Sequence, residues 1–398
     1  MADCDQEAPG VPGWLWNAIG SDPGIQDPYM HFRSAGNTPA CSYAAADFAF
    51  KDPRFAPMAP VPSGRPFWRT FNRWLIMLDG APHTAIRTLI VGALSANAVG
   101  SYRPLVEATV QRLLDELEPI GKMDLRAQFA FKLPTAVISE LMDLPDDVRD
   151  GLEHLLVDVD LAFAHQGHEE FLARGDRAIT ELLGRMDRLI VEREARPGND
   201  LISRLIAGAD GRQGSFPDHE DLVANAVFLL EAGHQSTMNA LTSGVYTLLM
   251  QAPQLKRLRH DPSLIPCAVD EMLRFNSPIG IVPRTARRDL AVPQGRVRAG
   301  TTIPFFLGAA NRDPEVFSAP DAFDVARTHN PHLAFASGFH RCVGAALARM
   351  ELQVALSALI RHLPDLRLVR QPRWTGVVPF RALNELRVAW TPLVPDPQ

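Results

Sequence analysis

The stretch that decides the fold reads Phe335-Ala-Ser-Gly-Phe-His-Arg-Cys-Val-Gly344, and it leads into a helix-forming run at 345–351. Cys342 stands just before this predicted helix, where unpaired backbone N–H groups and the positive end of the helix dipole favour a thiolate. A thiolate is the form of cysteine that binds metal. Gly338 permits a tight turn, and Gly344 lets the backbone approach a flat, bulky group. The stretch therefore predicts a metal-binding cysteine beside a large ligand; the alternative is a buried structural cysteine.

The same stretch resembles the cysteine loop of the cytochrome P450 family, written Phe-x-x-Gly-x-(His/Arg)-x-Cys-x-Gly, and every fixed position is present. The resemblance implies a mainly α-helical fold with a small β-rich portion around a buried haem b, which is iron protoporphyrin IX. It implies that the Cys342 thiolate binds the haem iron. It also implies that Phe335 and Gly344 lie beside the cofactor and that His340 contacts a haem propionate.

The resemblance implies an activity as well. A haem-thiolate monooxygenase uses dioxygen and two external electrons to hydroxylate or otherwise oxidise a small, largely apolar organic substrate. No flavin-binding or nicotinamide-binding stretch is visible in the sequence, so the electrons must come from another protein. In the family this donor is usually a small acidic ferredoxin with its reductase. We expect a basic patch for it on the cysteine side, formed by Arg69, Arg73, Arg87 and Arg341.

Composition is consistent with a large globular protein from a reduced compartment. The chain has 398 residues, of which 46% are hydrophobic, and a net charge of −6. Its four cysteines are scattered and form no C-x-x-C pair, which favours an interior, reducing location that we take to be the cytoplasm. No stretch approaches the roughly 20 apolar residues of a membrane span, and the acidic N-terminal residues indicate neither a signal peptide nor a membrane anchor. No Lys/Arg block indicates nucleic-acid binding.

A second motif reads Leu78-Asp-Gly-Ala-Pro-His-Thr-Ala-Ile-Arg87. His83 and Arg87 are four positions apart and so lie on one face of a helix. Alone, such a pair is usually a solvated surface feature. The segment resembles the family's Asp-x-Pro-x-His-x-x-x-Arg motif, whose His and Arg contact haem propionates, although its proline falls one place late, at Pro82. The resemblance gives Arg284 the same role.

A helix of about 30 residues is predicted from Pro217 to Met250, with Ser215 and Asp218 as a capping arrangement. An interior glycine costs about 1 kcal/mol relative to alanine, so Gly233 needs a reason. Hydroxyls at Ser236 and Thr237 can bond to the preceding turn and bend the helix. The segment beginning at Ala232 resembles the family's Ala-Gly-x-(Asp/Glu)-Thr motif. This likeness implies that Ala232 and Gly233 lie over the haem on the oxygen side.

The same motif departs from the family at two positions. Gln235 stands where the family has an acid, and Ser236 stands where it has threonine. An amide cannot ionise and so cannot pass protons as a carboxylate does. We expect Ser236, together with Thr237 next to it, to donate a hydrogen bond to bound oxygen. His234 is a further candidate, although a histidine here is more often simply packed beside the cofactor.

Further segments carry the scaffold and the pocket. Glu271 and Arg274 resemble the family's Glu-x-x-Arg, a buried structural pair whose downstream partner we place at Arg327. Residues 279–286 predict a strand, 290–307 a hairpin and 374–392 a final short sheet. By resemblance the first strand lines the substrate pocket. The candidate pocket residues are Ile281, Val282, Val378 and Phe380, although core packing explains the last two equally well.

The sequence as a whole predicts a single domain over residues 1–398. Residues 1–70 are rich in proline and glycine and predict irregular structure with short elements. Apolar residues at three- and four-residue spacing predict further helices. These helices are expected at 105–117, 133–141, 148–161, 179–191, 201–207 and 259–275. The cysteine loop and its following helix occupy 335–361.

Three other functions stay open. The loss of the acid at Gln235 is compatible with a haem-thiolate enzyme that uses peroxide directly or couples aromatic substrates by radical chemistry. A haem-binding sensor or carrier without turnover is a second alternative, and a cofactor-free helical protein is a third. The substrate itself is not identified, because a terpenoid, a steroid, an aromatic or a peptide-derived compound would all suit the generic apolar residues.

Overall fold

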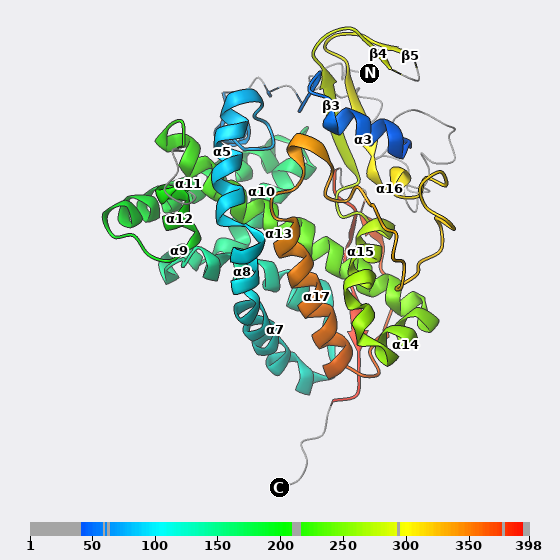
Figure 1. Cartoon of the computed structure of the whole chain (residues 1–398). Helices are drawn as coiled ribbons and strands as arrows, with labels where there is room; N and C mark the ends of the chain where they lie inside the picture. The colour runs from blue at the N-terminus through cyan, green and yellow to red at the C-terminus, as the bar shows by residue number, and fades with distance from the viewer. Residues whose placement is uncertain are drawn as a thin grey trace, which may run out of the picture.

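The computed structural model describes residues 41–58, 60–61, 64–208, 216–292, 295–375 and 379–392. Most of these residues lie in helices, and the strands form four small sheets of two or three strands each. Helices fill most of Figure 1, and the β3 and β4–β5 strands gather at one end of the molecule. The prediction of a mainly α-helical fold with a small β-rich portion is confirmed.

Helices of all lengths make up the framework. No helix in the described ranges is both long and apolar enough to cross a membrane. The α-helices are α3 (Tyr43–Lys51), α4 (Pro66–Phe71), α5 (Gly80–Ala93), α6 (Ala96–Ser101), α7 (Arg103–Leu117), α8 (Lys132–Leu141), α9 (Asp146–Arg149), α10 (Leu152–Ala164), α11 (Glu169–Ala195), α12 (Leu201–Ala207), α13 (His219–Met250), α14 (Ala252–His260), α15 (Ile265–Phe275), α16 (Leu307–Ala310) and α17 (Ala345–His362). The shorter helical turns are η2 (Glu118–Ile120), the π-helical η3 (Arg126–Ala130), η5 (Pro262–Leu264) and η6 (Gly338–His340).

Helix α13 is the central element and confirms the long predicted helix. It begins after Asp218, whose side chain accepts a hydrogen bond from the Asp221 N–H and so caps the first turn. Ser215, the other half of the predicted capping arrangement, lies outside the described residues. Helices α8, α11, α15 and α17 and the η3 turn all pack against α13, which crosses the middle of the molecule in Figure 1. A helix surrounded in this way must be apolar on nearly every face.

Several predicted helices need new boundaries. The helices expected at 105–117, 133–141 and 201–207 correspond to α7, α8 and α12. The run at 148–161 is divided into α9 and α10 because Gly151 has a left-handed φ of 66°, which interrupts the helical path. The run at 259–275 is also divided, since Pro262 lacks the N–H needed to continue α14 into α15.

The strands form four separate sheets. Strand β3 is central to one sheet of order β1-β3-β6, and β10 is central to another of order β2-β10-β7. Strands β4 and β5 form a hairpin, and β8 pairs with β9. The strands are β1 (Phe55–Ala56), β2 (Lys122–Asp124), β3 (Ile281–Ala286), β4 (Leu290–Val292), β5 (Gly295–Val297), β6 (Thr302–Phe306), β7 (Arg367–Leu368), β8 (Trp374–Thr375), β9 (Ala382–Leu383) and β10 (Arg387–Ala389).

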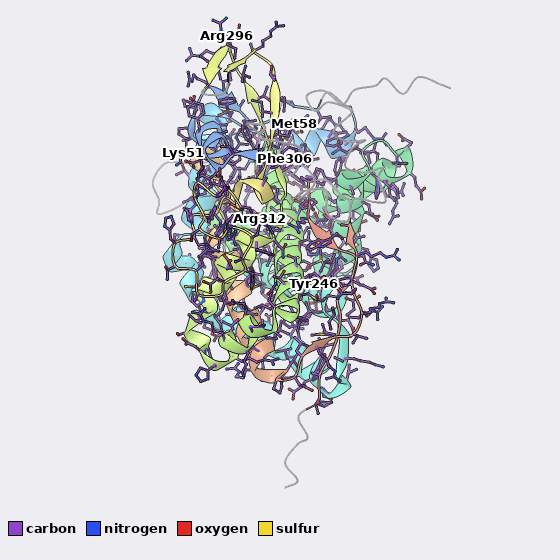
Figure 2. The ribbon with its side chains drawn as sticks, turned by 90° about the vertical axis from the view of Figure 1, so that its right-hand side faces the viewer. Lys51, Met58, Tyr246, Arg296, Phe306 and Arg312 are labelled. Carbon is purple, nitrogen blue, oxygen red and sulfur yellow. The ribbon has the colours of Figure 1, made fainter. Side chains whose placement is uncertain are left out.

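The predicted strand at 279–286 and the predicted hairpin are both present. Leu290 pairs with Val297 in the hairpin, while β6 pairs with β3 instead. Figure 2 shows Arg296 on this hairpin at one end of the molecule, far from Tyr246 of α13. The prediction of one final sheet at 374–392 is wrong. Strands β8 and β9 pair with each other, whereas β10 joins a sheet with the distant β2, because a short strand completes its hydrogen bonds with whichever edge lies beside it.

Candidate functional site

The cysteine loop is a strained turn held against α3. The Cys342 N–H donates to the Phe335 carbonyl at 2.9 Å, which closes the loop. Gly338 has the left-handed φ of 68° that its predicted role requires, and a Cβ there would lie 2.1 Å from the Phe50 carbonyl oxygen. Ala336 has a φ of 53°, which is uncommon for a residue with a side chain. Strain of this kind persists only where the surrounding structure enforces it.

Two polar contacts fix the loop from outside. The Ser337 hydroxyl donates to Asp47 Oδ1 on α3 at 2.7 Å. On the other side the guanidinium of Arg349 lies 4.6 Å from the centre of the Phe335 ring, and its Nε donates to Asp270 at 2.7 Å. Arg349 was missed by the sequence reasoning. A charged residue little more than one turn into a mostly apolar helix was the available signal.

The Cys342 side chain is exposed, and yet burial raises the pKa of its thiol. These two facts agree if the sulfur faces a space inside the protein rather than the bulk solvent. The predicted thiolate-favouring contacts are present, since the Gly344 N–H and the guanidinium groups of Arg87, Arg341 and Arg349 all lower that pKa. For the thiol by itself, the loss of solvation on burial is larger than the combined effect of these contacts.

Helix α13 contains a single window in its buried length. Between Leu222 and Val245 every residue is buried except Ala232, Gly233, Gln235 and Ser236. A Cβ added at Gly233 would have no atom within 4 Å. The four partly exposed residues coincide with the motif that departs from the family. An open patch in an otherwise enclosed helix is the expected result when a large cofactor belongs there.

The two hydroxyl residues of the window differ. The Ser236 hydroxyl donates to the Ala232 carbonyl at 3.0 Å, which is the bond to the preceding turn that the sequence predicts. Thr237 is buried and lies outside the window, so the structure does not bring it to the same space. The buried Oε1 atom of Gln235 has no hydrogen-bond partner among the described residues.

Four basic side chains gather beside the cysteine loop. The rings of His83, on α5, and His340 lie 4.1 Å apart between centres. Arg87 donates to the Arg341 carbonyl at 2.8 Å. Arg284, on β3, is buried, donates to the Pro283 carbonyl at 2.9 Å and lies 4.8 Å from the centre of the Phe50 ring. We call His83, Arg87, Arg284 and His340 the cation cluster.

No carboxylate pairs with the cation cluster among the described residues. Asp79 is the acid that acts on it, but its carboxylate binds Arg287. Burial lowers the pKa of His83, of Arg87 and of Arg284, the last to about 10, and burial together with His83 lowers the pKa of His340 to about 3. Buried cations without partners are costly. The cluster is therefore suited to hold an anionic ligand beside Cys342, as two carboxylates of a haem would be.

The Glu271 network is satisfied within the protein. Glu271 and Arg274 on α15 have no exposed side-chain surface, and Arg274 Nε donates to Glu271 Oε2 at 2.7 Å. Arg327 Nε donates to the same oxygen at 3.0 Å. Arg274 also donates to the carbonyls of Asn311, Pro320 and Ala322 in the segment that leads to the cysteine loop. The three residues proposed as scaffold are thus brought together.

The predicted substrate-contact residues are only partly placed. Ile281 is buried at the start of β3 and Val282 is half-buried. Phe380 is half-buried and forms a bridge with Ile279, beside Ile281. Val378 lies outside the described residues. Their contact with a substrate stays a prediction.

The predicted basic patch needs correction at Arg73. Its guanidinium binds Asp221 at 2.6 Å and Glu220 at 2.6 Å, at the start of α13. Arg73 therefore neutralises the acidic first turn of that helix and is not part of the cysteine side. Arg87 and Arg341 do meet there.

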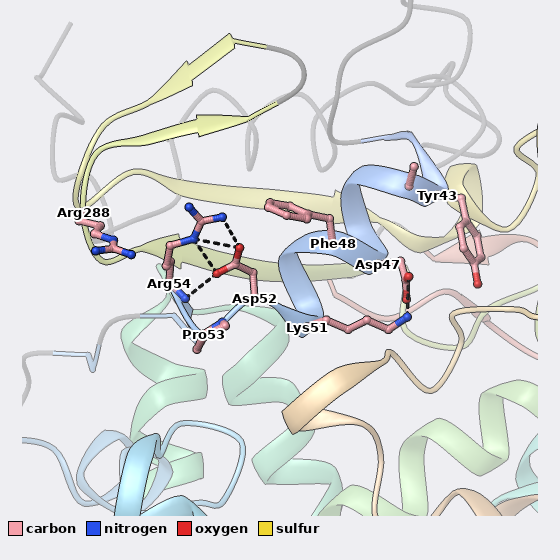
Figure 3. A pocket seen from close by; sticks show the side chains of 9 residues that line it. Tyr43, Asp47, Phe48, Lys51, Asp52, Pro53, Arg54 and Arg288 are labelled. Carbon is pink, nitrogen blue, oxygen red and sulfur yellow. Dashed lines mark hydrogen bonds and ion pairs between the residues drawn. The ribbon is translucent and has the colours of Figure 1, made fainter.

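A surface hollow of about 810 Å³ lies along α3 and the segment after it (Figure 3). None of the predicted site residues lines it. Its charged side chains bind one another, since Lys51 contacts Asp47 at 2.7 Å and Arg54 Nε contacts Asp52 at 2.9 Å. Arg288 is the remaining charged residue of the hollow, and a single exposed cation does not make a site for chemistry.

Comparison with protein families gives a match to the Cytochrome P450 family over residues 162–364, a range that includes α13, the Glu271 network and the cysteine loop. The chain is 33% identical to the biotin biosynthesis cytochrome P450 of Bacillus subtilis (strain 168), over 85% of this chain and 87% of that one. It is 38% identical to the nocardicin C N-oxygenase of Nocardia uniformis subsp. tsuyamanensis, over 79% of each. It is 39% identical to the 20-oxo-5-O-mycaminosyltylactone 23-monooxygenase of Streptomyces fradiae, over 74% of this chain and 69% of that one.

Solved structures agree with this relationship. The crystal structure of P450BioI in complex with acyl carrier protein bearing hexadec-9Z-enoic acid has a TM-score of 0.86 and 30% identity, covering 93% of this chain and 100% of that one. The myxobacterial CYP267B1 in complex with myristic acid has a TM-score of 0.83 and 29% identity, covering 94% and 99%. The matched regions contain the cysteine loop and the helix window described above. The chain therefore belongs to the cytochrome P450 family of haem-binding monooxygenases.

Proposed function

We propose that this chain takes two electrons from a separate donor protein and uses them, with dioxygen, to oxidise a small and largely apolar organic substrate. The observation that carries the proposal is the cation cluster, which lies beside Cys342, includes the buried His83 and Arg284, and lacks carboxylate partners among the described residues. That arrangement suits a bound group with one metal and two carboxylates. Haem has both.

The residues present fit that cofactor. Cys342 would bind the iron, and His83, Arg87, Arg284 and His340 would neutralise the propionates. When bound, the haem supplies the oxygen-activating chemistry. Ala232 and Gly233 leave room on the oxygen side, and Phe335 and Gly344 flank the sulfur. The protein itself supplies orientation and a low-dielectric space, in which hydrogen bonds to developing charge are stronger.

The oxygen-side residues support hydrogen bonding more than acid catalysis. Ser236 is the exposed hydroxyl of the α13 window, and it can turn from the Ala232 carbonyl toward an oxygen atom in that space. Gln235 cannot ionise, and it offers an amide oxygen that accepts a hydrogen bond. Water bound there would be oriented by this amide without being protonated by it.

The substrate class is proposed from relatives together with the apolar lining. Two structural neighbours were solved with fatty acyl ligands, one of them attached to an acyl carrier protein. Other relatives are named for nocardicin C, for 20-oxo-5-O-mycaminosyltylactone and for polyketide biosynthesis. Ile281 and Val282 would present an apolar wall to either kind of molecule. A ligand screen by haem absorption shift should start from free and carrier-bound hexadec-9Z-enoic acid and extend to polyketide-like compounds.

A ferredoxin-type donor with its reductase, acting in the cytoplasm, completes the proposal. Arg87 and Arg341 meet beside the cysteine loop, and Phe339 next to them is 57% exposed. Such a basic face with an apolar centre suits a small acidic protein. Arg341→Glu should slow reduction by ferredoxin at low salt while leaving reduction by dithionite unchanged. Equal ferredoxin rates in both proteins would contradict this docking face.

A peroxide-using enzyme is the second candidate, and the missing acid at Gln235 favours it. The two candidates are separated by measuring product from the same ligand under two conditions. One mixture contains ferredoxin, its reductase and NADPH, and the other contains hydrogen peroxide alone. Product from the first mixture supports the electron-driven function. If product forms only in the peroxide mixture, the peroxide-using function replaces the electron-driven one.

A further inference from the structure

A polar stripe lies along one face of the buried helix α13. Glu231, Gln235 and Asn239 are each four positions apart and therefore occupy the same face. Glu231 is 7% exposed and Asn239 is 1% exposed. Both side-chain atoms of Asn239 that can hydrogen-bond lack a partner among the described residues, as does Gln235 Oε1.

Such a stripe needs water. A buried polar group without a hydrogen bond costs about 1–3 kcal/mol. Native proteins avoid this cost by holding buried waters, each of which makes about three hydrogen bonds to groups of this kind. Three polar side chains in a row, two of them with orphaned atoms, provide the partners for more than one water molecule.

The charge of Asp160 acts on Glu231 of the stripe, and the charge of Arg126 acts on Asp160. Asp160 comes from α10, and Arg126 comes from η3, which packs against α13. Burial and the negative charge of Asp160 hold the pKa of Glu231 well above its usual range. Burial raises the pKa of Asp160 to about 7, although Arg126 opposes the rise. Both carboxyl groups therefore favour the protonated form more than an exposed acid does.

His234 borders the stripe but does not serve as its acid. Its ring lies 4.5 Å from that of Phe131, and its Nε2 atom is buried without a partner among the described residues. Burial and the nearby Arg126 lower its pKa to about 3. A neutral imidazole can accept a hydrogen bond from water, but it does not store a proton at neutral pH.

The helix geometry connects the stripe to the oxygen side. At 100° per residue, Gln235 lies about 40° around α13 from Glu231, and Ser236 lies about 100° beyond Gln235. Glu231 is thus on the enclosed side, Gln235 is at the edge of the window and Ser236 is within it. Going around α13, one therefore meets first the buried acid Glu231, then Gln235, and then Ser236 beside the space where oxygen is expected.

We propose that the face of α13 carrying Glu231, Gln235 and Asn239 holds water molecules through which Glu231 gives protons to the oxygen site, in place of the acid absent at position 235. The inference rests on the proposed electron-driven function. In that reaction RH, dioxygen, two electrons and two protons become ROH and water. The electrons come from the donor protein. Each proton leaves the Glu231 carboxyl through water, and the carboxylate then regains a proton from solvent by way of Asp160.

The first test does not depend on turnover. Carbon monoxide is photolysed from the reduced holoenzyme, and the infrared difference spectrum is recorded in the C=O region of protonated carboxylic acids. A band that shifts in D₂O, disappears in Glu231→Gln and persists in Glu351→Gln is expected. Glu351, on α17, is a matched control because it is also buried and its Oε2 atom lacks a partner among the described residues. A band that survives in Glu231→Gln would overturn the inference.

A second variant keeps the test decisive if Glu231→Gln does not fold. Asp160→Asn removes the negative charge that raises the pKa of Glu231, so the same band should titrate at lower pH than in the unmodified protein. An unchanged titration would overturn the coupling between the two carboxyl groups.

Turnover separates failure of this inference from failure of the proposed function. Dioxygen consumption driven by ferredoxin and NADPH should fall about 100-fold in Glu231→Gln, within the range for loss of a general acid. Carbon monoxide binding to the dithionite-reduced protein should be unchanged, because that step takes up no proton. Unmodified protein that consumes no dioxygen would contradict the proposed function, and equal dioxygen rates in the two proteins would contradict the inference alone.

Discussion

The partly buried cation cluster and the buried Glu271 network are both groups of charged side chains, and they differ in how that charge is balanced. Glu271 is bound by Arg274 and by Arg327, so its charge is balanced within the protein. The cation cluster has no carboxylate partner among the described residues. A balanced network stabilises a fold without further help, whereas an unbalanced one is stable only when something else supplies the opposite charge. The comparison separates scaffold from ligand site.

The largest expected effect is in the balanced network. Glu271→Gln leaves Arg274 buried beside an uncharged amide and should destabilise the protein by about 3–5 kcal/mol. Urea unfolding of the haem-free protein measures the change. A loss below about 1 kcal/mol would mean that the network is not the scaffold described here.

The unbalanced cluster should respond with the opposite sign. Arg284→Met removes a buried, unpaired charge, so the free energy of unfolding of the haem-free protein should not fall. Haem binding should weaken by about 10-fold to 100-fold, which corresponds to the roughly 1.5–3 kcal/mol of a hydrogen bond to a charged group. Haem transfer to apomyoglobin measures the affinity. If the haem-free protein is destabilised as strongly as by Glu271→Gln, the distinction between the two regions fails.

A smaller effect should appear in the pH dependence of stability. Burial and Arg87 lower the pKa of His83 below its ordinary value of 6.5. The His83 ring therefore binds a proton more readily in the unfolded chain than in the folded one. The stability that the neutral ring contributes is complete above about pH 6.5 and is lost as the pH falls. His83→Gln should flatten the decline of haem-free stability below pH 6.5. If the stability of His83→Gln depends on pH as that of the unmodified protein does, protonation of His83 does not contribute to the acid instability.

The smallest expected effect is at the surface. Arg367 contacts Asp365 at 3.1 Å, and both side chains are largely exposed. Arg367→Gln should change the free energy of unfolding by less than about 0.5 kcal/mol, because solvent screens an exposed pair. The same urea titration used for Glu271→Gln provides the comparison. If Arg367→Gln loses as much free energy of unfolding as Glu271→Gln, burial does not determine how much an ion pair contributes to stability.

Local patterns predicted much of this molecule. The cysteine loop, α13 and the Glu271–Arg274 spacing are each determined by residues close in sequence, and the structure forms the loop, the helix and the ion pair. The division at Gly151 was missed because the apolar period continues across a residue whose left-handed φ interrupts the helix. The role of Arg73 was also missed, since its acidic partners are about 150 residues away.

The polar stripe was beyond the reach of sequence reasoning for a similar reason. Asp160, Arg126 and Glu231 come from separate segments, and only the packing of η3 and α10 near α13 allows them to act on one another. A glutamate within an apolar helix was the one local signal. It does not say which other charges will lie near it.

The central claim is that the Cys342 sulfur binds the haem iron. The reduced carbon monoxide difference spectrum of Cys342→Ala, compared with that of Cys267→Ala, tests it most directly. If Cys342 binds the iron, the thiolate-type band is lost in Cys342→Ala and retained in Cys267→Ala. A Cys342→Ala protein that keeps the spectrum and the activity of the unmodified protein would show that the Cys342 sulfur does not bind the iron.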